Sequence, residues 1–129
     1  MGHELKRILY IEDEIDIQTV TAMALEDVGG FTVICCSSGM EALAAAPDAN
    51  ADLILLDVMM PGMDGPATFS ALRALSQTAQ TPVIFMTAKV QASEIQHYMR
   101  LGATDVIAKP YDPMKLSAQI GEIWQRAAG

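Results

Sequence analysis

The sequence predicts a doubly wound α/β domain, with helices on both faces of a five-stranded parallel sheet. Five short apolar runs alternate along the chain with five helix-like segments. The strand candidates begin near Ile8, Thr32, Leu53, Val83 and Thr104. Successive starts are 24, 21, 30 and 21 residues apart, which leaves room each time for one helix and two short loops. Runs such as 53–56 do not alternate with polar residues, as expected of strands that are buried on both faces.

The first two helices are predicted from periodicity and capping signals. Segment 15–28 has an apolar stripe and stops at Gly29-Gly30, and Asp13 or Asp16 could cap its start. The stripe consists of Ile17, Val20, Thr21, Ala24, Leu25 and Val28. A capping box over 38–41 opens a second helix, which is expected to end before Pro47.

Three more helices follow in the second half of the chain. Segment 65–75 has Pro66 in its first turn, and segment 92–101 stops at Gly102. Asp112-Pro113 caps the fifth helix. The inner side of this helix has Leu116, Ile120, Ile123 and Trp124. Right-handed crossovers place the helices on both faces of the sheet, and the doubly wound order 2-1-3-4-5 makes strands 1 and 3 neighbours where ligands bind.

Composition limits the function classes. The chain has 129 residues, of which 51% are hydrophobic and 19% charged, as expected of one compact soluble domain. Its net charge of −8 argues against nucleic acid as a direct partner, because phosphate backbones need a basic face. The sequence has no apolar run long enough for a membrane span and no signal-peptide core, so the cytoplasm is the default location.

The cysteines and histidines give no sign of a metal or redox site. Cys35 and Cys36 are neighbours in a predicted strand, where adjacent side chains point to opposite faces. We therefore expect two reduced thiols in the core and no disulfide. His3 and His97 are isolated in the sequence, and each is expected at the surface.

Polar residues follow four of the predicted strands. They are Glu12-Asp13, Asp57, Thr87 and Lys109-Pro110. Since the carboxyl ends of parallel strands meet at one edge of a sheet, these side chains should lie together. Three carboxylates at one place repel each other unless a cation is present. The pattern predicts a divalent metal beside a phosphorylatable aspartate.

Each of these residues also has an ordinary interpretation. An acidic pair after a strand is usually a solvated loop or a helix cap, a single Asp is mostly a turn residue, and Lys109 could be a surface lysine. These explanations leave the convergence of four strand ends unexplained. Loop packing is the expected role of the side chains of Met59, Met60 and Met63.

Five motifs together resemble the receiver domain of bacterial response regulators. They are 11–14 (IEDE), 56–65 (LDVMMPGMDG), 87–88 (TA), 102–103 (GA) and 109–111 (KPY). They occur in the family's order and at similar spacing, and the resemblance extends over essentially the whole chain. It implies a flavodoxin-like fold and a single receiver domain over 1–129, with no output domain on this chain.

The resemblance also implies a chemistry. Asp57 would accept a phosphoryl group from a histidine kinase or a phosphotransfer protein. Asp13 and Asp57 would bind Mg²⁺ directly, Glu12 would act through water, and the backbone carbonyl of Met59 would be a further ligand. In the same resemblance, Lys109 would neutralise a phosphoryl oxygen, and Thr87 would hydrogen-bond another.

The chain departs from the family pattern at one position that matters for switching. Many receivers have Tyr or Phe three residues before the lysine, whereas this chain has Val106. Tyr111 is aromatic but follows the proline, and the sequence leaves open whether it substitutes. Met59 and Lys89 occupy the positions that tune phosphoryl lifetime in the family.

A phosphorylation-controlled signalling module is the leading interpretation, and the alternatives are an enzyme and an interaction domain. The module would contact a downstream effector, which the sequence does not identify, through segments 92–101, 104–108 and 113–128, and this face could also join two copies. A phosphatase or phosphomutase would need a second carboxylate two residues after Asp57, where this chain has Met59. A phosphorylation-independent interaction domain would be free to lose the acidic pair, Thr87 and Lys109, and all are present.

Overall fold

The computed structural model describes residues 4–128, and it confirms the predicted fold class. The strands are β1 (Arg7–Ile11), β2 (Thr32–Cys36), β3 (Leu53–Asp57), β4 (Val83–Thr87) and β5 (Asp105–Ala108). The helices are α1 (Ile15–Asp27), α2 (Gly39–Ala49), α3 (Gly65–Arg73), α4 (Ala92–Leu101) and α5 (Pro113–Ala128). All neighbouring strands are parallel, in the order β2-β1-β3-β4-β5.

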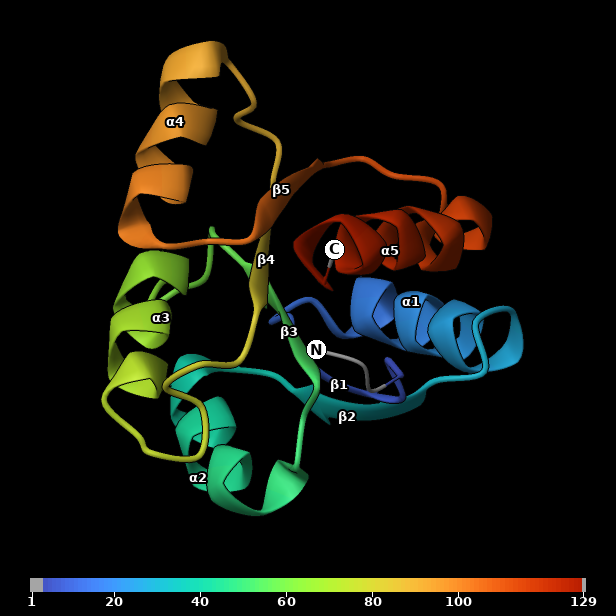
Figure 1. Cartoon of the computed structure of the whole chain (residues 1–129), viewed down its shortest axis with the longest axis horizontal. Coiled ribbons are helices and arrows are strands. Elements are labelled where there is room, and N and C mark those ends of the chain that lie inside the picture. Colours follow the sequence, from blue (N-terminus) through green and yellow to red (C-terminus); the bar gives the residue numbers. More distant parts are fainter. Residues whose placement is uncertain (1–3, 129) are drawn as a thin grey trace.

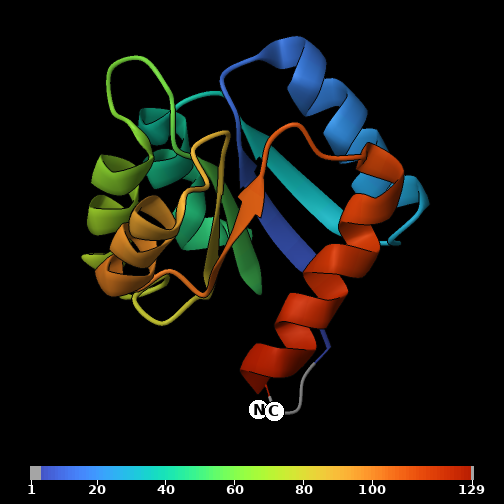
Figure 2. The same ribbon diagram turned by 90° about the horizontal axis from the view of Figure 1, so that it is seen from above.

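The sheet lies between two layers of helices. Figure 1 shows α1 and α5 on one side of the sheet and α2, α3 and α4 on the other, and the turned view in Figure 2 shows the same three layers. Each face of the sheet has its own hydrophobic cluster. One helix follows each of the first four strands and brings the chain back to the end of the sheet where the strands begin, so all five strands run in the same direction.

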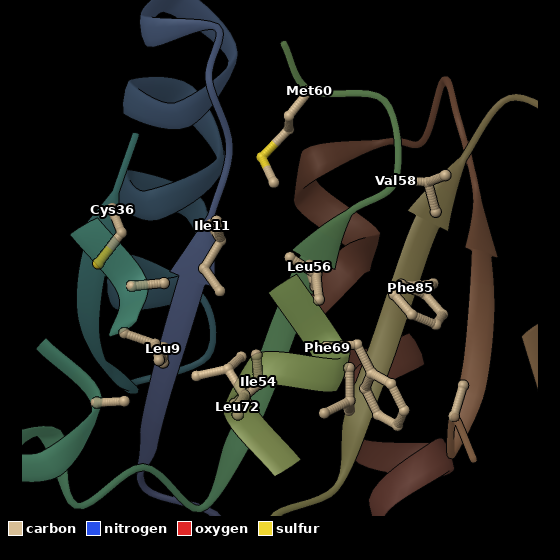
Figure 3. Packing of buried hydrophobic residues seen from close by; sticks show 14 of the residues in the cluster. Leu9, Ile11, Cys36, Ile54, Leu56, Val58, Met60, Phe69, Leu72 and Phe85 are labelled. Carbon is tan, nitrogen blue, oxygen red and sulfur yellow. The ribbon is translucent and has the colours of Figure 1, made fainter. Parts of the chain in front are cut away.

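Alternation along the strands divides the core between the two layers. Leu9 and Ile11 of β1 pack in the cluster with α2, α3 and α4, whereas Ile8 and Tyr10 pack in the cluster with α1 and α5. Figure 3 shows the first cluster, where Phe69 of α3 approaches strand β4. Full burial of β3 and β4 explains why their apolar runs do not alternate with polar residues.

Helix ends differ from the predictions in three places. Helix α2 was expected to end before Pro47, but it continues through this proline to Ala49. Pro47 is exposed near the end of the helix, where its missing N–H removes a single intrahelical bond, and Asn50 ends the helix in the left-handed conformation (φ 50°). Helices α1 and α3 end at Asp27 and Arg73, before the predicted ends at 28 and 75.

The start and the stripe of α1 also differ in part. Its N-cap residue is Glu14, which makes no side-chain cap bond, and neither of the expected aspartates occupies that position. Val20 and Val28, which were expected to face the core, are 55% and 49% exposed. Thr21, Ala24 and Leu25 are buried as expected, so the buried stripe is narrower than the apolar pattern.

The expectation of two core thiols was wrong for Cys35. Cys36 is buried in the first cluster, but Cys35 is exposed because β2 is an edge strand. Both cysteines are free, as predicted. His97 is exposed, as expected, and His3 lies outside the described residues.

Candidate functional site

The acidic residues lie where the two central strands end. β1 pairs with β3 through Ile11 and Leu56, so Glu12 and Asp57 follow paired residues at the same edge. Glu12 is 0% exposed and Asp57 is 3% exposed, although both are acids. Buried carboxylates are rare without a partner, which indicates that this edge is built to hold charge.

Three carboxylates form a cluster that fits a hard cation. One oxygen each from Glu12, Asp13 and Asp57 lies within 4.8 Å of the others. Oxygen donors of this kind suit Mg²⁺, which prefers a few carboxylates together with water. The chemistry of the donor set therefore fits the predicted metal.

Met59 and Met60, which follow Asp57, behave differently from each other. Met60 is buried in the first hydrophobic cluster, in agreement with a packing role. The side chain of Met59 is 61% exposed, so loop packing was the wrong expectation for it. Metal binding by the Met59 backbone carbonyl remains a prediction.

Lys109 is the cation that the structure places within this cluster. Its Nζ lies 2.8 Å from Oε1 of Glu12 and 3.1 Å from Oδ1 of Asp57. Its backbone N–H donates to the Thr87 carbonyl at 2.9 Å, which fixes the start of the loop after β5. Sequence reasoning placed Lys109 at this edge but did not predict its pairing with both acids, because loop side chains have no periodicity that shows their direction.

The electrostatics of the site follow from burial and close charges. Burial raises the pKa of Asp57 to about 7, the charge of Glu12 adds to this rise, and Lys109 opposes it. Burial lowers the pKa of Lys109, but the hydrogen bond to Glu12 and the charge of Asp57 outweigh it, so this pKa is raised overall. One ammonium thus offsets only part of the repulsion between the acids.

Backbone packing holds the two acidic loops in place. Gln18 of α1 donates from Nε2 to the carbonyls of Glu12 and Cys36, at 2.9 and 3.2 Å, and joins the ends of β1 and β2. A Cβ on Gly65 would lie 2.7 Å from the Asp57 carbonyl oxygen, so only glycine allows α3 to start this close to β3. Sequence reasoning missed Gln18, whose only signal is its place one turn into the helix that follows the acidic pair.

Thr87 ends β4 and is 1% exposed. Its Oγ1 accepts a hydrogen bond from the backbone N–H of Lys89 at 3.1 Å. A hydroxyl that accepts a bond still has its proton to donate. Residues 88–91, which lead into α4, are exposed.

Tyr111 does not replace the aromatic residue that is absent at position 106. Its hydroxyl lies 2.8 Å from Oγ1 of Thr21 and 3.5 Å from the hydroxyl of Tyr10, on the face of the sheet that α1 and α5 cover. Val106 packs against the first cluster, on the opposite face. The sequence did not predict this group of three hydroxyls.

Among residues 4–128, no helix is both long enough and apolar enough to span a membrane.

Comparison with known proteins identifies the family. The model of the response regulator receiver domain matches residues 8–121. PhoP of Bacillus subtilis, an alkaline phosphatase synthesis transcriptional regulatory protein, is 37% identical over 122 residues, which cover 95% of this chain and 50% of PhoP. The transcriptional regulatory protein CpxR of Escherichia coli K12 is 38% identical over 123 residues, which cover 95% of this chain and 51% of CpxR. The chain thus spans about half the length of these curated relatives.

Solved structures show the same architecture. Chemotaxis protein CheY4 of Vibrio cholerae matches with a TM-score of 0.85 at 32% identity, over 93% of this chain and 99% of CheY4. The receiver domain of the sensor histidine kinase PA1611 from Pseudomonas aeruginosa, which has a magnesium ion in its active site cleft, matches with a TM-score of 0.79 at 28% identity. This match covers 95% of the present chain and 97% of that domain. The family match, the strand order and the acidic edge agree, and the chain belongs to the receiver domains of two-component response regulators.

Proposed function

We propose that Asp57 accepts a phosphoryl group from the phosphohistidine of a histidine kinase or phosphotransfer protein, with Mg²⁺ bound at the acidic cluster. Residues 1–129 would act as a single receiver domain that signals through contact with a downstream effector protein. The observation behind this proposal is the position of Asp57, which is 3% exposed at the end of β3 beside Glu12, Asp13 and Lys109.

The transfer forms one bond and breaks another. A carboxylate oxygen of Asp57 bonds to phosphorus, the bond from phosphorus to the imidazole nitrogen breaks, and the imidazole leaves with the electron pair. Both the attacking carboxylate and the phosphoryl group are negative, so the main barrier is charge repulsion. Residues that neutralise or orient this charge therefore determine the rate.

Glu12, Asp13 and Asp57 would hold the metal, and the carbonyl of Met59 would complete the protein ligands. Bound Mg²⁺ would neutralise charge on the phosphoryl oxygens. The ammonium of Lys109 is already within 3.1 Å of Asp57 and would move to a phosphoryl oxygen once the carboxylate is modified. Because a phosphoryl group adds negative charge at this point, the lysine gains a stronger partner than the one it leaves.

Thr87 would report that the phosphoryl group is present. Its hydroxyl proton can be donated to a phosphoryl oxygen, but a movement of the hydroxyl toward Asp57 lengthens or breaks its bond to the Lys89 N–H. That bond holds the first turn of the link into α4. Phosphorylation should therefore reposition residues 88–91 and the start of α4.

Helix α4 is well suited to such a movement. Among the residues of α4, all of which the structure describes, only Tyr98 is buried. Met99 and Leu101 are 41% and 40% exposed. A helix with one anchored side chain loses little packing when it shifts. We propose the surface of α4, β5 and α5 as the contact face for the effector, and a second copy could use the same face.

Intact mass spectrometry tests this function. The protein should gain one phosphoryl mass when it is incubated with acetyl phosphate and Mg²⁺, and the gain should disappear in EDTA. The variant Asp57→Asn should gain nothing. Asp64→Asn is the matched control, because Asp64 caps α3 outside the acidic cluster and its replacement should leave phosphorylation intact. Phosphorylation of Asp57→Asn would refute the assignment.

A further inference from the structure

We propose that Tyr111 is a positioning residue for Lys109, and that its hydroxyl acts through a hydrogen bond to Thr21 of α1. The proposal rests on the role assigned above to Lys109 in binding the phosphoryl group. It adds a link between α1 and the reaction centre.

Three hydroxyls from three elements meet at this point. Tyr10 of β1 is 0% exposed and Thr21 of α1 is 1% exposed. The Tyr111 hydroxyl lies 2.8 Å from Thr21 Oγ1, within the normal range for two oxygens, but 3.5 Å from the Tyr10 hydroxyl, beyond that range. The strong partner of Tyr111 is therefore Thr21.

The loop that begins at Lys109 has few other attachments. The Lys109 N–H bonds to β4, and Asp112 accepts the Met114 N–H at the start of α5. Among residues 4–128, the bond from Tyr111 to Thr21 is the one side-chain hydrogen bond between α1 and loop 109–112. This bond is separated from the lysine by Pro110 alone.

Apolar packing holds the loop only in part: Tyr111 packs against the second hydrophobic cluster, but an open groove separates the rest of the loop from α1. A groove of about 480 Å³ lies between them, lined by Ile17, Val20 and Pro110 together with Thr21, Tyr111 and Lys109. An open groove gives the loop no close-packed neighbour on that side. The Tyr111–Thr21 bond, together with the Lys109 N–H bond to Thr87, then sets the position of the loop relative to α1, and so the position of the Lys109 side chain over Asp57.

The experiment uses four variants of the full chain. Tyr111→Phe and Thr21→Val each remove one hydroxyl of the bond, the double variant removes both, and Tyr10→Phe removes only the distant neighbour. For each protein, the initial rate of phosphorylation by acetyl phosphate at saturating Mg²⁺ is measured by intact mass. Urea unfolding gives the stability of the same samples.

Each single variant of the bond should phosphorylate about threefold to tenfold more slowly, the factor that corresponds to one net hydrogen bond. Tyr10→Phe should stay within about twofold of the parent, as expected when a contact beyond hydrogen-bonding range is lost. The double variant should be as slow as the singles and no slower, because all three lose the same bond. It should also be less stable than the parent, because the buried Tyr10 hydroxyl loses its Tyr111 neighbour. A double variant that is slowed by the product of the two single factors would show that the two hydroxyls act separately, and would overturn the proposal.

A second measurement separates this proposal from the proposed function. In the unphosphorylated protein, the NMR signal of the Lys109 side chain (Cε and Nζ) reports its pairing with Glu12 and Asp57. It should move toward the position of a free lysine in Tyr111→Phe and stay in place in Tyr10→Phe. A parent that cannot be phosphorylated would refute the proposed function alone, whereas an unchanged Lys109 signal in Tyr111→Phe would refute the positioning role alone.

Discussion

Replacement of Asp57 by asparagine should stabilise the metal-free protein, by an amount that grows with pH. Burial and the charge of Glu12 raise the pKa of Asp57 from 3.8 to about 7. Between these two values the folded protein binds more protons than the unfolded chain, so the parent loses stability as the pH rises toward 7. Above pH 7 the penalty is fully present, and below pH 3.8 it is absent. Asparagine has no charge and avoids it.

The size of the effect follows from the shift. One pKa unit corresponds to about 1.4 kcal/mol, so a rise from 3.8 to about 7 gives a penalty of roughly 4 kcal/mol at pH 8. At pH 5 only about a third of the pH range between the two pKa values has been crossed, which gives a penalty of about 1–2 kcal/mol. Against the 5–15 kcal/mol that holds a typical domain folded, about 4 kcal/mol is a large gain.

Urea unfolding in EDTA at pH 5 and pH 8 measures both values. The advantage of Asp57→Asn over the parent should rise by about 2–3 kcal/mol between the two pH values. The exposed Asp48 provides the control, since Asp48→Asn should change stability by less than about 0.5 kcal/mol at either pH. An advantage that does not change with pH would refute the argument from burial. A Mg²⁺ stabilisation as large in Asp57→Asn as in the parent would refute the ligand role.

Four further predictions follow. Lys109→Ala should destabilise the metal-free protein by about 2 kcal/mol or more in urea unfolding, because two buried acids lose their shared ammonium. The same variant should bind beryllofluoride more weakly in NMR titrations, and equal affinity would exclude the lysine from phosphoryl recognition. Iodoacetamide at pH 8 should modify exposed Cys35 before Cys36, which is buried and whose pKa burial raises to about 11; equal rates in peptide mapping would contradict this order. Ser117→Ala should keep or raise stability by up to about 1 kcal/mol in urea, since the buried hydroxyl has no partner among the described residues, and a loss above this size would reveal a missed bond. Val106→Ala should preserve the amide shifts that beryllofluoride induces over residues 87–101, and their disappearance would contradict a switch based on the loop after β4.

Much of the fold and of the acidic edge could be predicted because it depends on topology. Apolar runs at βαβ spacing specify a parallel sheet, and a parallel sheet brings all carboxyl ends of its strands to one edge. Glu12, Asp13 and Asp57 therefore had to converge, whatever their rotamers. The structure places oxygens of these three residues within 4.8 Å of one another.

The features that could not be predicted depend on local geometry. Pro47 breaks a helix only if a needed donor is lost, and near the end of α2 the loss is small enough to tolerate. Exposure of Cys35 depends on β2 lying at the edge of the sheet, which the apolar run alone does not specify. The contacts of Lys109 and Tyr111 depend on loop conformation, for which the sequence has no periodic signal.

Chemical mapping of the phosphorylated residue tests the central claim most directly. Borohydride reduces an aspartyl phosphate to homoserine, and digestion followed by mass spectrometry then identifies the position of the change. After treatment with acetyl phosphate and Mg²⁺, the peptide that contains residues 53–57 should have homoserine at position 57, and Asp13 and Asp64 should be unchanged. Homoserine at position 13 or 64, with Asp57 unmodified, would contradict the account.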